Sequence, residues 1–207
     1  MLYSDDVYLA IIRSPIMEYG VSSWTSLHID AARRFEQDID RRWYRSDSLS
    51  RGIDWMSTPF DSSKLLQGFN YIAVGVVDVA NGDIVVCPSS HTSGGTPGNY
   101  YQAQSNLGST NLTNEDLTSS DWADVTSDRI QFRMLVTCYA FFLAYRYLAN
   151  KEKDDDYADQ REYWLGQYYM EFDRQLSLGI DYDYDGDGVI DSSEKSSGYP
   201  RMRIKRV

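Results

Sequence analysis

The chain has 207 residues, of which 42% are hydrophobic and 25% charged, and its formal net charge at pH 7 is −11. This length and composition predict one sizeable core, with room for an appended subdomain. The acidic balance makes the chain a poor nonspecific ligand for nucleic acid. Its longest uncharged stretch in the aromatic-rich region, Met134 to Tyr145, is shorter than the ~20 residues of a membrane-spanning helix, so we expect no membrane partner.

Two segments in the first half of the chain have a helical pattern. Apolar residues recur every four positions between residues 26 and 44, which predicts an amphipathic helix. Residues 61–79 favour a second helix that begins at the N-cap Asp61 and stops at Asn81-Gly82. Because Tyr71–Val79 is rich in β-branched residues, a strand that turns at Asn81-Gly82 onto residues 84–87 is the competing interpretation.

The middle of the chain changes in composition. Ser, Thr, Gly and Asn dominate residues 88–127, so we interpret residues 83–127 as a long irregular or β insertion. Insertions of this length are often functional, and Tyr100, Tyr101 and Trp122 could anchor a protein contact. A mobile surface excursion is the alternative.

The second half of the chain predicts a helical hairpin. Residues 128–150 are hydrophobic most of the way round a helix, which is typical of the centre of a bundle. An antiparallel partner then runs to about Leu178, with a core stripe at every fourth residue: Trp164, Tyr168, Phe172 and Leu176. The predicted fold is therefore mainly α, a helical bundle over residues 1–180 with the insertion, followed by a calcium loop at 181–194 and an extended tail at 195–207.

An acidic run near the C-terminus fits the twelve-residue calcium loop of an EF-hand. Aspartates stand at loop positions 1, 3 and 5, a glycine (Gly188) at position 6 and a glutamate at position 12. The predicted calcium ligands are Asp183, Asp185, Asp187, Val189 (through its carbonyl), Asp191 and Glu194. Because only one such loop is present, we expect a structural calcium clip rather than a sensor. An acidic turn held by Asx-type hydrogen bonds is the alternative.

Residues with catalytic potential do not form a recognisable pattern. The two histidines, His28 and His91, are far apart in the sequence, and Cys87 and Cys138 lie in apolar contexts typical of buried free thiols. Cys87 with His91 lacks an orienting third group, and no glycine-rich phosphate loop is present. We predict that the protein is not an enzyme.

The last thirteen residues invert the charge of the chain. From Lys195 onward there are five basic residues and no acidic ones. Basic and apolar side chains alternate, which suits an extended strand added to the edge of a partner's sheet. The predicted partner-binding residues are Arg201, Met202, Arg203, Ile204, Lys205 and Arg206.

This order of segments resembles that of the head-tail adaptor (connector) proteins of tailed bacteriophages. The resemblance covers the helices described above, the acidic Asp-Gly turn and the basic tail after Gly198. It implies a virion protein, made in the host cytoplasm, that forms a ring of about twelve copies in the neck between capsid and tail. The implied partners are the portal protein, which receives the C-terminal tail, a downstream stopper or tail protein, and double-stranded DNA that passes without sequence recognition.

A function of a different class competes with this one. The same calcium loop, with 17 tyrosines and five tryptophans, also suits a stand-alone calcium-dependent module that binds protein or carbohydrate. In a third interpretation the basic tail binds nucleic acid, but five charges beside an acidic loop would give weak, salt-sensitive binding.

Overall fold

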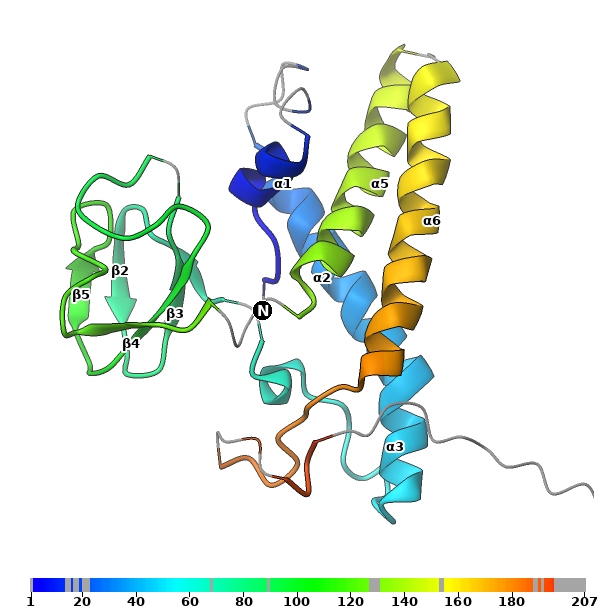
Figure 1. Cartoon of the computed structure of the whole chain (residues 1–207), viewed down its shortest axis with the longest axis horizontal. Coiled ribbons are helices and arrows are strands. Elements are labelled where there is room, and N and C mark those ends of the chain that lie inside the picture. The colour runs from blue at the N-terminus through cyan, green and yellow to red at the C-terminus, as the bar shows by residue number, and fades with distance from the viewer. Residues whose placement is uncertain are drawn as a thin grey trace, which may run out of the picture.

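The computed structural model describes residues 2–13, 16, 19, 23–67, 69–88, 90–126, 131–152, 155–187, 190 and 192–195. Figure 1 shows two parts side by side, a helical body and a smaller β module (residues 69–126). The helical elements are α1 (Asp6–Ile12), α2 (Thr25–Ile39), the π-helical η2 (Asp40–Tyr44), α3 (Arg45–Ser50), the 3₁₀ turn η3 (Ser62–Leu65), α5 (Arg133–Glu152) and α6 (Asp155–Leu178).

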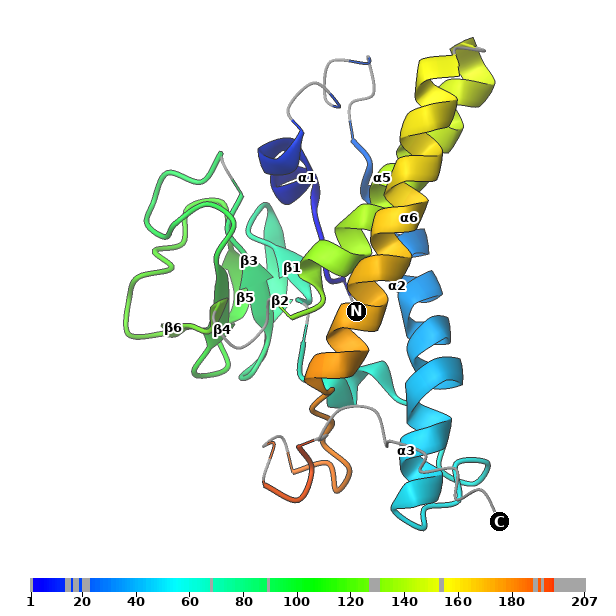
Figure 2. The same cartoon turned by 45° about the vertical axis from the view of Figure 1, so that its right-hand side comes forward.

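Helices α2, α5 and α6 form the helical body and run alongside one another (Figure 2). The helix predicted over residues 26–44 is confirmed and continues through η2 into α3. The predicted hairpin of α5 and α6 is also confirmed. The stripe on α6 lies in the main hydrophobic core, where Trp164 stacks on Phe141 with ring centroids 4.3 Å apart.

The β module contains two small sheets. Strands β1 (Tyr71–Ile72), β3 (Ile84–Val86), β4 (Tyr100–Ala103) and β6 (Trp122–Asp124) form one sheet in that order, and β2 (Val76–Val79) pairs with β5 (Gly108–Asn111) in the other. Strand β1 is parallel to β3, whereas the remaining pairs are antiparallel. The module has its own apolar cluster, which includes Val85, Leu112 and Trp122.

The prediction of a mainly α bundle is wrong. The described residues are 46% helical and 14% strand, and the two sheets give a mixed α/β fold. Strands begin at Tyr71, so the β structure starts before the predicted insertion at residue 83. The reason is that strands of two to four residues carry too little periodicity to be recognised singly, although together they enclose a core.

The helix predicted over residues 61–79 is also wrong. Only Ser62–Leu65 is helical, and Val76–Val79 forms β2. Gly75, with φ +74°, breaks the segment, and the β-branched residues that follow pack better in a sheet. The competing strand interpretation is right about the strands but not about a direct hairpin, because β2 and β3 belong to different sheets.

A buried arginine joins the β module to the helical body. Arg133, the first residue of α5, donates to the carbonyl oxygen of Gly98 at 2.7 Å and lies 3.4 Å from the Asp5 carboxylate. Its guanidinium also lies over the rings of Tyr8 and Tyr100, at 4.0 and 4.9 Å from their centroids. The Arg133 side chain thus links α5 to α1, to the segment before α1 and to the β module.

Gly166 lies inside the continuous helix α6, and no contact within the described subunit requires a glycine there. A Cβ atom at this position would meet no heavy atom within 4 Å. We therefore predict that Gly166→Ala raises the free energy of unfolding by about 0.5–1 kcal/mol, because alanine loses less backbone entropy in a helix. Urea denaturation measures the change, and an equal or lower stability would show that the glycine is required by the fold.

In the part of the chain that the structure describes, no helix combines the length and apolar character needed to cross a membrane.

Candidate metal centre

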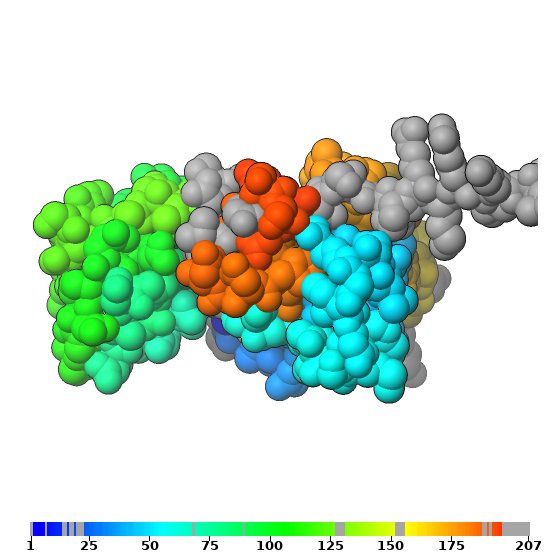
Figure 3. Space-filling model, turned by 90° about the horizontal axis from the view of Figure 1, so that it is seen from below, coloured from blue at the N-terminus to red at the C-terminus, as the bar shows by residue number. Residues whose placement is uncertain are grey.

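The aspartate loop (residues 181–194) follows α6 directly. Gly179, with φ +101°, ends the helix in the left-handed conformation that favours glycine. The chain then buries Tyr182 among aromatic residues of the helical body, with its ring centroid 5.2 Å from that of Tyr44 and 5.8 Å from that of Phe60. In Figure 3 the loop lies on the underside of the molecule, between the β module and the residues around α3.

Backbone and side-chain contacts with Lys64 hold the beginning of the loop. The Asp183 N–H donates to the Lys64 carbonyl oxygen at 2.8 Å, and the Lys64 ammonium donates to the Tyr184 carbonyl oxygen at 3.1 Å. An antiparallel bridge between Asp181 and Lys195 closes the base of the loop. The Lys64 contacts thus hold the beginning of the acidic turn on the helical body, and the bridge joins the two ends of the loop.

Three carboxylates converge inside this turn. One carboxylate oxygen from each of Asp183, Asp185 and Asp187 lies within 4.8 Å of the others. Asp183 is only 3% exposed and accepts from the Gly186 N–H at 2.5 Å, while Asp185 accepts from the Asp187 N–H at 3.1 Å. The turn therefore orients the carboxylates through its own backbone, and the three could together hold a metal ion.

The other predicted ligands are Glu194, Val189 and Asp191, of which the structure describes only Glu194. Glu194 is 4% exposed, and its Oε1 accepts from the backbone N–H groups of Tyr184 at 2.6 Å and of Asp185 at 3.2 Å. Glu194 ends the loop and is not a member of the three-carboxylate cluster. Val189 and Asp191 lie outside the described residues, as does the whole predicted partner-binding segment, Arg201 to Arg206.

Asp47 of α3 and Arg51, the residue after that helix, hold the loop from a second side. The Tyr184 hydroxyl donates to the Asp47 carboxylate at 2.5 Å, and burial, with that carboxylate, raises the pKa of Tyr184. Arg51 lies over the Tyr184 ring at 4.6 Å and donates to the Ser193 carbonyl oxygen at 2.5 Å. Sequence reasoning missed Asp47, Arg51 and Lys64 as supports, because nothing local marks them as neighbours of residue 184.

Neighbouring negative charges affect the protonation of Asp185. The Asp187 N–H bond lowers the pKa of Asp185, but partial desolvation and the charges of Asp187 and Glu194 outweigh it, and the net shift is upward. Without a cation, the neighbouring negative charges thus oppose ionisation of Asp185. A bound divalent ion would offset this repulsion, and the all-oxygen donor set suits a hard cation.

The upward shift predicts that any binding of a cation at this cluster depends on pH. Protons and a cation would compete for the Asp185 carboxylate, so the affinity for an added divalent cation such as calcium is expected to fall as pH drops from about 7 to about 4.5. In the metal-free protein the raised pKa means that the folded state binds more protons, so this carboxyl favours folding at acid pH and opposes it as pH rises. Calcium titrations at both pH values test the prediction, and Asp185→Asn should show a flatter pH dependence. An equally steep dependence in Asp185→Asn would contradict it.

A Ser-His-Asp cluster that the sequence did not reveal lies elsewhere, in the helical body. His28 Nδ1 is 2.8 Å from the Ser4 hydroxyl, and His28 Nε2 is 3.0 Å from an Asp6 carboxylate oxygen. Ser4 and His28 are only 1% and 2% exposed, so a substrate could not reach the hydroxyl. We interpret the cluster as a buried hydrogen-bond network that ties α1 and the segment before it to α2.

The two thiols are buried and free, as expected. Burial, with a smaller contribution from Glu171, raises the pKa of Cys138 to about 12, so this thiol stays protonated near neutral pH.

Comparisons of the chain with protein-family models, with curated proteins and with solved structures find no match.

Proposed function

We propose that the aspartate loop binds a calcium ion that clips the end of α6 to the segment leading into the basic tail. One observation carries this proposal: three aspartate oxygens lie within 4.8 Å of one another in a turn anchored by Lys64 and α3. Anchoring lowers the entropy that would be lost when the ion orders the turn.

Calcium suits the site better than other common cations. Carboxylate oxygens in an irregular turn favour calcium, which accepts irregular coordination, over magnesium, which demands a near-ideal octahedron. No His or Cys side chain belongs to the described cluster, and zinc commonly binds such ligands. Asp183, Asp185 and Asp187 would hold the ion, with Glu194 close enough to contribute after rearrangement.

We further propose that the protein is a non-catalytic structural subunit, a head-tail adaptor of a tailed bacteriophage that assembles as a ring. The resemblance of α2 and of the α5–α6 hairpin, of the acidic turn and of the basic tail supports this class, whereas residues 61–79 no longer contribute to it. In that setting the calcium clip would fix the direction in which the tail leaves the body to dock on the portal. The net charge of −11 suits a DNA conduit, because negative walls repel the phosphate backbone.

Counting copies of the chain in virus particles tests the adaptor proposal. Quantitative mass spectrometry of gradient-purified particles from the source culture should find about a dozen copies per particle, measured against the major structural protein. The particle-free fraction of the same culture is the control. Absence from particles would overturn the adaptor proposal and leave the stand-alone calcium module, whose ligand would then be sought by pull-down with and without chelator.

A further inference from the structure

The β module carries negative charge and no positive charge. The whole chain has twenty Lys and Arg residues, but none of them falls within residues 69–126. The same segment contains six acidic residues: Asp78, Asp83, Glu115, Asp116, Asp121 and Asp124. The ion pairs of the described residues all lie in the helical body. The module therefore favours a basic partner.

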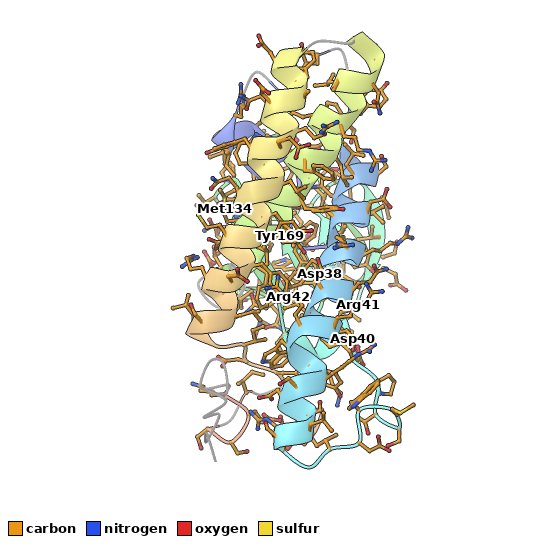
Figure 4. All side chains as sticks on the ribbon, turned by 90° about the vertical axis from the view of Figure 1, so that its right-hand side faces the viewer. Asp38, Asp40, Arg41, Arg42, Met134 and Tyr169 are labelled. Atoms are coloured by element: carbon orange, nitrogen blue, oxygen red, sulfur yellow. The ribbon has the colours of Figure 1, made fainter. Side chains whose placement is uncertain are left out.

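Cations of the helical body are directed elsewhere. Figure 4 looks at the flank of the body opposite the β module, and Arg41 and Arg42 lie on that flank. Arg42 pairs there with Asp173 of α6. At the junction with the module, the buried Arg133 lies beside the Asp5 carboxylate, which belongs to the helical body. These arginines thus leave the charge of the module uncompensated.

Strand β2 has one edge without a partner strand among the described elements, since its sheet contains only β2 and β5. The carbonyl oxygen of Gly75 accepts from the Leu112 N–H at 2.8 Å, on the side of β5. Backbone groups alternate in direction along an antiparallel strand, so the N–H and C=O groups of Val76 and Asp78 face the open edge. Such an edge is a template for a further strand.

The side chains of β2 distinguish between the strands that could pair with it. Val77 and Val79 pack in the apolar cluster of the module, whereas Val76 is 66% exposed and Asp78 is also exposed. The Asp78 carboxylate disfavours pairing of this edge with a second β2, since like charges would then lie close together. A strand with cations on its outer face has no such penalty. The edge of β2 therefore selects a basic strand.

The C-terminal tail of the chain has the matching chemistry. Twelve residues follow Lys195, the last residue that the structure describes, and from Lys195 onward five residues are basic and none is acidic. Basic and apolar side chains alternate in residues 201–205. As an extended strand, this segment would carry cations on one face and apolar side chains on the other. Its five residues are enough to pair with the four residues of β2.

The start of the tail favours the module of a second copy. The bridge between Asp181 and Lys195 is antiparallel, so the chain at Lys195 heads back towards the C-terminal end of α6. Helix α6 lies on the flank of the helical body opposite the β module (Figures 1 and 4). The five residues 196–200 span at most about 18 Å before the alternating segment begins. The tail thus leaves its own subunit on the side away from its own module.

We propose that residues 201–205 of one copy add as a third strand to the open edge of β2 in a second copy. The apolar side chains of the tail face the cluster beside Val77, and its cations lie on the outer face near Asp78. This inference goes beyond the proposed function and does not rest on it, because it uses only the β module and the composition of the tail. In the proposed adaptor, the portal and β2 would compete for the same tail.

Two full-length variants test the contact. Asp78→Pro removes an N–H that faces the open edge, together with the charge, and a proline is tolerated at such an edge position. The tail variant carries Arg201→Glu, Arg203→Glu and Lys205→Glu. Each variant alone is expected to self-associate at least about tenfold more weakly than the wild type, whose own association should weaken as salt rises. Sedimentation velocity measures both effects.

An equal mixture of the two variants identifies the donor and the receptor. The edge variant keeps an intact tail, and the tail variant keeps an intact β2, so one contact of the wild-type kind can form between them. Native mass spectrometry is expected to find dimers that contain one copy of each variant, with few dimers of either variant alone.

Two further variants control for the fold. Ser109 pairs with Asp78 in the ladder, and its N–H faces the free edge of β5, so Ser109→Pro is the matched control and should associate like the wild type. Asp78→Lys reverses the charge without changing the backbone and should also weaken association. It replaces Asp78→Pro if circular dichroism shows that the proline variant is unfolded.

Three outcomes would overturn this contact. The first is self-association that persists in the edge and tail variants alike, and the second is the absence of mixed dimers from the mixture. The third is a wild type that stays monomeric at every concentration tested, which would exclude an exchange of tails between copies. None of them decides the adaptor proposal, which depends on the copy number in virus particles.

Discussion

Saturating calcium is expected to raise the melting temperature of this protein by about 5–10 °C. An ion that binds only the folded state stabilises it by about 2.7 kcal/mol at a free concentration of a hundred times Kd, and 1 kcal/mol corresponds to about 2–4 °C in a chain of this length. Asp183→Asn should abolish the rise. The asparagine oxygen can still accept from the Gly186 N–H, so the variant removes a ligand charge while keeping the turn.

The matched control is Asp181→Asn, which removes the same charge from a neighbouring residue outside the three-carboxylate cluster. Differential scanning calorimetry with calcium and with chelator measures all three proteins. A rise of equal size in Asp183→Asn would place the ion elsewhere, and the lack of any rise in the wild type at about millimolar calcium would refute the metal site.

Replacing Arg133 with methionine is expected to lower the free energy of unfolding by about 3–5 kcal/mol, because it leaves the Asp5 carboxylate buried without its cation. Asp5 is 3% exposed and Arg133 is 7% exposed. The substitution also removes the bond to the Gly98 carbonyl oxygen and the contacts with two aromatic rings. Urea denaturation, followed by circular dichroism, measures the loss.

Two variants check that explanation. Arg133→Met combined with Asp5→Asn should recover part of the loss, since the buried negative charge is then gone while asparagine can still cap α1. Arg146→Met removes an exposed arginine of the same helix and should change stability by about 0.5 kcal/mol or less. Equal effects of the Arg133 and Arg146 substitutions would show that the buried pair does not stabilise the junction with the β module.

The helices could be predicted because each repeats one pattern over many turns. The stripe that begins at Trp164 recurs every four residues, and only a helix places those side chains on one face. The β module could not be predicted in the same way. Residues 71–79 fit both a helical and a strand pattern, and the outcome depends on pairing with residues far along the chain, such as Val76 with Asn111.

The metal centre could be predicted in part for a similar reason. Asp183, Asp185 and Asp187 are close in sequence, so their spacing alone indicates that the carboxylates converge. The position of Glu194 depends on how the loop packs, and in this structure its carboxylate binds backbone N–H groups. The supports from Lys64, Asp47 and Arg51 come from distant segments and depend on the tertiary fold.

Terbium luminescence tests the calcium site most directly. A terbium ion in the loop would lie close to Tyr184, so excitation of tyrosine should produce terbium emission that saturates at one ion per chain and is displaced by calcium. The Asp183→Asn variant should show little of this emission. Emission in the wild type that does not saturate at one ion, or that calcium fails to displace, would contradict a calcium clip at Asp183, Asp185 and Asp187.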